Sequence, residues 1–144
     1  MYNVVVVGAD DSPTALEAFN RAVEFTKMSG GTLHIVTAYK PKPPGGSDVP
    51  DEFRYSMGST LEADVLLRRL ADLATAQGVA TELHAATEDP ADALVGVADR
   101  EGADLIVVGN KGMKGVRRVL GSVPNSVAHQ ANCSVLIVDT VSDS

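Results

Sequence analysis

A glycine-rich, positively charged segment is the part of this sequence best suited to bind an anion. Between Gly109 and Ser122 there are four basic residues and no acidic residue, so the segment carries a charge of +4. Glycines let backbone N–H groups approach an anion closely, and a helix that begins near Ser122 would point the positive end of its dipole at the same place. We therefore expect a phosphate chain to bind here, although a turn with a solvated basic face explains the same composition. The internal glycines are Gly112, Gly115 and Gly121, and the basic residues are Lys111, Lys114, Arg117 and Arg118.

Two adjacent acidic residues, Asp10 and Asp11, follow the first apolar run of the chain. Carboxylate oxygens are ligands that Mg²⁺ prefers, and paired acids at this place also suggest a phosphoryl-accepting receiver domain. Such a domain needs an aspartate at the end of the third strand and a lysine at the end of the fifth. Here Asp89 is expected to cap a helix and the last strand runs into Asp139 and Thr140, so we reject the receiver interpretation.

Two common phosphate-binding motifs do not occur. Gly115 is followed by Val116, and the chain has no Gly-Lys-Ser/Thr sequence, which excludes a Walker A loop. Of the three glycines that a dinucleotide fingerprint places after the first strand, only Gly8 is present. The sequence 29–32, Ser-Gly-Gly-Thr, is similar to a pyrophosphate-binding loop. Such a loop follows a strand, whereas this segment precedes one, so we reject this motif as well.

The histidines and the cysteine are expected to have structural roles. His34, His84 and His129 do not show a metal-ligand spacing such as H-x₃-H, and the first two lie within expected strands. No histidine can be linked in sequence to a serine nucleophile, so we do not expect a hydrolytic triad. Cys133 lies at the start of an apolar run and is expected to be a packed thiol.

Hydrophobic periodicity predicts short strands that would position these residues. All but the third are rich in β-branched residues and apolar on both faces, which is typical of parallel strands buried between two helical layers. The third alternates and is expected at an edge of the sheet. The expected strands are Val4 to Gly8, Leu33 to Ala38, Thr81 to Ala86, Leu105 to Val108 and Val135 to Val138.

Four helices are expected between the strands. Ser12, Asp89 and Ser122 are expected N-cap residues, because their side chains can accept a hydrogen bond from a free N–H of the first turn. Residues 40–57 hold four prolines and two glycines and are expected to form an irregular loop, either a mobile flap, an interface arm or a plain solvated connection. The expected helices run from Pro13 to Gly30, from about Thr60 to Gln77, from Pro90 to Gly102 and from about Ser122 to Asn132.

The alternating order of strands and helices predicts a single α/β domain over residues 1–144, with a flexible tail at 141–144. Right-handed crossovers give a doubly wound five-stranded parallel sheet of Rossmann-like or flavodoxin-like order 3-2-1-4-5. In such a sheet, ligands bind beyond the carboxyl ends of the strands, near the point where the strand order reverses. The loops that follow Gly8 and Val108 are therefore the expected binding loops.

The composition limits the class of protein. The chain has 144 residues, of which 44% are hydrophobic and 4% aromatic, and its one cysteine excludes a disulfide framework and a multi-thiolate metal site. Apolar runs are too short to span a membrane, and the first strand begins too near Met1 to leave room for a signal peptide, so we expect a cytoplasmic protein. The formal charge is −7 and becomes −11 outside the segment 109–122, which argues against a general nucleic-acid or anionic-membrane binder.

Three parts of the sequence resemble the universal stress protein family, a branch of the adenine-nucleotide α-hydrolase-like fold. They are Val5 to Pro13, Ala103 to Gly109, and Gly121 to Val127 followed by Val135 to Val138. Members that bind ATP carry G-x₂-G-x₉-G-[ST], which the resemblance places on Gly109, Gly112, Gly121 and Ser122. Eight residues separate Gly112 from Gly121 where the family pattern has nine, and the additional Gly115 could absorb this difference.

The resemblance implies the positions of an ATP site. Asp10, with the backbone near Ala9 and Ile35, would face the adenosine, and Asp10 is also the candidate ligand for an accompanying Mg²⁺. The phosphates of the nucleotide would lie at the end of the fourth strand and along the loop that follows it. The residues implied on that side are Val108, Gly109, Gly112, Gly115, Gly121, Ser122 and Val123. AMP or cyclic AMP are alternative ligands, and the resemblance also implies a homodimer paired through Val135 to Val138.

Two functions are therefore compared. The first is an ATP-binding regulatory protein of the stress response, in which hydrolysis or self-phosphorylation is at most slow, because the sequence offers no convincing general base or nucleophile. The second is a dimeric protein-interaction module of the same fold that does not bind nucleotide, in which the shortened loop is inactive and the basic segment contacts a partner protein.

Overall fold

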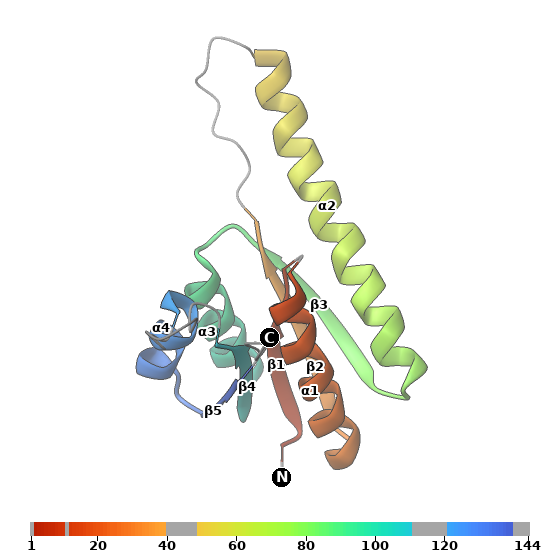
Figure 1. Ribbon diagram of the computed structural model, residues 1–144, viewed down its shortest axis with the longest axis vertical. Coiled ribbons are helices and arrows are strands. Elements are labelled where there is room, and N and C mark those ends of the chain that lie inside the picture. The colour runs from red at the N-terminus through yellow and green to blue at the C-terminus, as the bar shows by residue number, and fades with distance from the viewer. Residues whose placement is uncertain (1, 11, 40–48, 111–120, 140–144) are drawn as a thin grey trace, which may run out of the picture.

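The five strands form one parallel sheet in the order β3-β2-β1-β4-β5, which confirms the predicted topology (Figure 1). The computed structural model describes residues 2–10, 12–39, 49–110 and 121–139, and only the backbone of 49–60. β3 lies at one edge, as its alternating sequence indicates, and β5 lies at the other. The strands are β1 Val4–Gly8, β2 Thr32–Ala38, β3 Ala80–Ala86, β4 Leu105–Gly109 and β5 Ser134–Val138.

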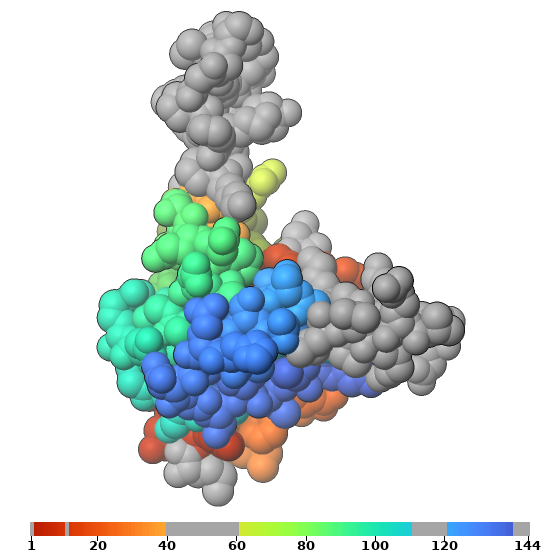
Figure 2. Space-filling view, turned by 90° about the vertical axis from the view of Figure 1, so that its left-hand side faces the viewer, coloured from red at the N-terminus to blue at the C-terminus, as the bar shows by residue number. Residues whose placement is uncertain are grey.

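Helices cover both faces of the sheet, α1 and α2 on one and α3 and α4 on the other (Figure 1). Figure 2 shows α3 and α4 side by side on their face, in green-cyan and blue. The helices are α1 Pro13–Ser29, α2 Val49–Ala76, α3 Pro90–Glu101 and α4 Ser122–Gln130. In the part of the chain that the structure describes, no helix combines the length and apolarity needed to cross a membrane.

The ends of α1 follow the sequence signals closely. The Ser12 hydroxyl accepts a hydrogen bond from the backbone N–H of Ala15 at 3.2 Å, as expected for an N-cap. Gly30 ends the helix with a φ of 72°, a left-handed conformation that favours glycine, and its N–H donates to the carbonyl of Thr26. These two ends fix the length of α1, and therefore the direction in which the chain enters β2.

The second helix is longer than predicted. It begins at Val49 rather than near Thr60, so the prediction of an irregular loop is wrong for residues 49–57, while 40–48 lie outside the described residues. Pro50 lies in the first turn, where a missing N–H is tolerated, and Asp51 and Glu52 are acidic residues that favour a helix N-terminus. The first turns of α2 extend beyond the sheet (Figure 1).

The core has two halves, one on each face of the sheet. Along β1 and β2, Val5, Val7, Leu33 and Ile35 pack toward α1 and α2, whereas Val6 packs toward α3 and α4. Successive side chains of a strand point to opposite faces, so a buried central strand is apolar at every position. A shift of one residue along β2 therefore decides which helices a side chain contacts.

Candidate functional site

A cleft lies at the carboxyl ends of β1 and β4, where the strand order reverses. Its volume is about 190 Å³, and we call it the β1–β4 cleft. The ends of β1, β2 and β4 form its base, and the N-terminal turns of α3 and α4 form its wall. Five residues predicted from the sequence line it, namely Ala9, Asp10, Val108, Gly109 and Val123.

The loop after β1 is fixed to β2 by backbone and side-chain hydrogen bonds. The N–H of Ala9 donates to the carbonyl of Val36 at 2.8 Å. The buried hydroxyl of Thr37 donates to the carbonyl of Ala9 at 2.9 Å. A Cβ atom at Gly8 would lie 3.3 Å from a terminal carbon of Leu94, so glycine allows α3 to pack closely against the end of β1. The floor of the cleft is therefore rigid.

Asp10 is held at the margin of this cleft by the turn that leads into α1. One of its carboxylate oxygens, Oδ1, accepts hydrogen bonds from the backbone N–H of Ser12, at 2.9 Å, and from the Ser12 hydroxyl. Asp10 also borders two larger hollows beside α2, of about 630 and 430 Å³, which share Arg69. A carboxylate in this position can accept hydrogen bonds from ligand hydroxyls or bind a cation.

The chain leaves β4 through Asn110, a residue that the sequence analysis did not single out. The N–H of Asn110 donates to the carbonyl of Val138 at 3.1 Å, and its side-chain amide donates to the Asp139 carboxylate at 3.0 Å. Its side chain is buried. These contacts connect the end of β4 to the end of β5 and fix the start of the glycine-rich segment. A polar residue directly after a buried strand was the available sequence signal.

The N-cap of α4 is Gly121 rather than Ser122, so the expectation that Ser122 caps this helix is wrong. Gly121 has no side chain that could accept a hydrogen bond from the first turn, and the exposed Ser122 is the first helical residue, bordering a separate hollow with Asp89. Val123 borders both this hollow and the β1–β4 cleft. The predicted residues Gly112 and Gly115, with Lys111, Lys114, Arg117 and Arg118, lie outside the described residues.

The prediction for Ile35 concerns its backbone, and Ile35 is not among the residues that line the cleft. Its side chain is fully buried in the core that faces α1 and α2. Val36, the next residue of β2, points to the opposite face and lines the cleft together with Ala38. The apolar residues Pro90, Leu94 and Pro124 of α3 and α4 also line it. These three could not be predicted as lining residues from the sequence, because their position depends on how the helices pack.

The three histidines and the cysteine partly follow the prediction that they have structural roles. His34 and His84 lie in strands β2 and β3, but the structure brings their rings into contact, which their spacing in the sequence did not indicate. His129 is exposed near the end of α4. Burial raises the pKa of the Cys133 thiol, and the nearby Asp104 and Asp99 carboxylates raise it further. A raised pKa keeps this thiol protonated at neutral pH, as expected for a packed cysteine rather than a nucleophile.

Comparisons with known proteins show which family the sequence matches. The family model described as the universal stress protein family matches residues 1–139. A universal stress protein of Mycobacterium tuberculosis is 36% identical over 143 residues, which cover 96% of this chain and 97% of the relative.

Two solved structures with bound nucleotides are also similar. A universal stress protein in complex with cAMP is 38% identical, with a TM-score of 0.75 and coverage of 97% of this chain and 98% of that chain. A universal stress protein from Archaeoglobus fulgidus in complex with dAMP is 26% identical, with a TM-score of 0.70 and coverage of 96% and 98%.

Proposed function

The chain belongs to the universal stress protein family, and from this we propose that it is an adenine-nucleotide-binding regulatory protein of the stress response. The observation that carries the proposal is the β1–β4 cleft, which lies at the switch point of the sheet and is lined by five of the residues predicted to bind nucleotide. The cAMP and dAMP complexes of similar chains support the same ligand class. Because ATP and related nucleotides are intracellular, the proposal implies a cytoplasmic protein.

Each part of a nucleotide has a candidate contact. The cleft is smaller than the roughly 300–1,000 Å³ of common ligand pockets, so this part of the site would hold the flat adenine ring, between Val36 and Val123. The Asp10 carboxylate would accept hydrogen bonds from the ribose hydroxyls or bind the Mg²⁺ that accompanies ATP. The phosphates would extend toward Gly109 and Gly121, at the N-terminus of α4.

We expect regulation rather than turnover from this site. The Asp10 carboxylate is already engaged by Ser12, which suits a positioning role better than that of a general base. The described residues that line the cleft include no histidine. Hydrolysis of ATP or self-phosphorylation is therefore expected to be slow and secondary to binding.

Titration calorimetry on the purified protein tests the proposal. ATP with Mg²⁺, AMP and cAMP are titrated separately, and at least one should bind in a one-to-one ratio with a Kd below about 1 mM, with GTP as the control for the base. No binding of any adenine nucleotide at millimolar concentration would overturn the proposal and favour the interaction module. GTP binding as tight as that of the adenine nucleotides would overturn the proposal that the site selects adenine.

The proposal includes a homodimer paired through β5. This strand lies at the edge of the sheet, and its residues Val135, Leu136 and Ile137 are only half-buried. An apolar edge strand without lysine or proline presents backbone groups that can pair with a second copy.

Leu136→Lys is expected to raise the dissociation constant of this dimer at least about tenfold, because it introduces a charge into the paired surface. Native mass spectrometry over a range of protein concentrations gives the dimer fraction, and Ala128→Lys, at an exposed position of α4, is the matched control. A parent protein that is monomeric at every concentration, or a Leu136→Lys protein that dimerises like the parent, would contradict pairing through β5.

A further inference from the structure

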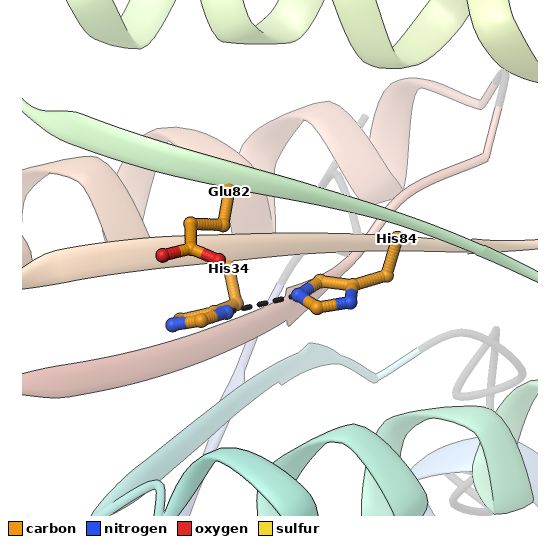
Figure 3. Close-up of side chains that lie close together, drawn as sticks. All are labelled: His34, Glu82 and His84. Carbon is orange, nitrogen blue, oxygen red and sulfur yellow. Dashed lines mark hydrogen bonds between the residues drawn. The ribbon is translucent and has the colours of Figure 1, made fainter.

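Three side chains that commonly bind metals meet on one face of the β2–β3 pair (Figure 3). In the parallel register, His34 is opposite Glu82, and Val36 is opposite His84. Alternate residues of a strand share a face, so His34, Glu82 and His84 all point toward the side covered by α3 and α4. One ligand atom from each of the three lies within 4.8 Å of the other two.

The distances suit a shared ion. Nδ1 of His34 lies 2.9 Å from Nε2 of His84, and the two rings are stacked with an interplanar angle of 24°. Two imidazole nitrogens bound to one tetrahedral Zn²⁺ at about 2.0–2.1 Å would be roughly 3.3 Å apart. The observed separation is only a few tenths of an ångström shorter than this value.

The cluster is buried at one end and open to solvent at the other. His34 is 3% exposed, His84 is half-buried and Glu82 is exposed, so the cluster opens outward along the edge of the sheet. The ligands are carried by two hydrogen-bonded strands rather than by loops, which holds their backbone positions. The Glu82 carboxylate supplies negative charge that offsets part of the charge of a cation.

We propose that His34, Glu82 and His84 form a binding site for a divalent transition-metal ion of the Zn²⁺ type. Two imidazole nitrogens and one carboxylate are a common set of Zn²⁺ ligands, and they leave one coordination position open for water or another group. Mg²⁺ prefers oxygen ligands and is not expected here. The site is distinct from the β1–β4 cleft, whose carboxylate is Asp10, and so does not depend on the proposed nucleotide function.

Calorimetric titration of ZnCl₂ into the full chain, without nucleotide and in a buffer that does not bind metals, tests the site. One Zn²⁺ per chain should bind with a Kd near or below about 10 μM, and MgCl₂ should not compete. His84→Asn should weaken binding at least about 100-fold and Glu82→Gln about tenfold. His129→Asn, which removes an exposed histidine elsewhere, and Asp10→Asn, which changes the cleft, should bind Zn²⁺ like the parent.

Folding and coordination are checked on the same proteins. Circular dichroism identifies any variant that fails to fold, and Glu82→Gln, at an exposed position, tests the site if His84→Asn does not fold. Co²⁺ in place of Zn²⁺ should give the visible absorption of a four-coordinate site in the parent and lose it in the folded variants of the cluster. Absence of Zn²⁺ binding to the parent, or unchanged binding in both His84→Asn and Glu82→Gln, would overturn the site and leave the two histidines as a hydrogen-bonded pair.

Discussion

Gly31→Ala is expected to lower the free energy of unfolding by about 2–4 kcal/mol. A Cβ atom at Gly31 would lie 2.3 Å from the carbonyl oxygen of Asn3 and 2.7 Å from its carbonyl carbon. Neither side of this contact can move easily. The Asn3 carbonyl accepts a hydrogen bond from the N–H of Thr32 at 2.9 Å, and the Asn3 N–H donates to the Asp104 carboxylate at 3.0 Å. The added methyl group would therefore push β1 and β2 apart where their pairing begins.

Urea unfolding measures this effect, and two other glycines are the controls. Gly30→Ala places a side chain in a left-handed conformation with open space around it, and should cost about 1 kcal/mol. Gly96→Ala, inside α3 and also in open space, should stabilise the protein by roughly 0.5–1 kcal/mol. A Gly31→Ala protein within about 0.5 kcal/mol of the parent would show that the strands tolerate the displacement.

Ala38→Phe is expected to weaken the binding of adenine nucleotides about 100-fold, which corresponds to about 2.8 kcal/mol. Ala38 is the last residue of β2 and lines the β1–β4 cleft, whose volume is about 190 Å³. An aromatic ring at this position would occupy space that the adenine ring needs. Because Ala38 is only partly buried, the larger side chain can extend toward the mouth of the cleft without expanding the core.

The same nucleotide titration measures this effect, with Ala85→Phe as the matched control. Ala85 is exposed on β3 and does not line the cleft, so the Ala85→Phe protein should bind nucleotide with the affinity of the parent. If Ala38→Phe binds nucleotide as tightly as the parent, the ligand binds elsewhere. If both variants lose affinity equally, the loss reflects a general effect of a large aromatic residue near the carboxyl ends of β2 and β3.

The sequence predicted the sheet well because each buried strand is a short apolar run between clear breaks. The strand boundaries agree within about one residue, and the order of the strands follows from the alternation with helices. The start of α2 could not be predicted in the same way. Prolines and glycines at 41–46 indicate a loop, and Pro50 does not separate a loop from the start of a helix, because proline is also favoured in the first turn of a helix.

The candidate site was predictable where topology alone positions a residue. Ala9, Asp10 and Gly109 follow or end strands β1 and β4, and the ends of these strands meet at the switch point. Residues whose place depends on packing could not be found, such as Leu94 of α3. The pair of His34 and His84 was missed because they are 50 residues apart, and motif spacing describes ligands on one element rather than on two paired strands.

The alternation of β2 has a consequence for how this protein can change in length. His34, Val36 and Ala38 serve the metal cluster and the cleft, while Leu33 and Ile35 complete the opposite core. An insertion or deletion of a single residue inside this strand would turn the side chains that follow it to the opposite face of the sheet and remove both sites. Length changes within this family should therefore be concentrated in the connections between strands and helices, where they leave the alternation of β2 intact.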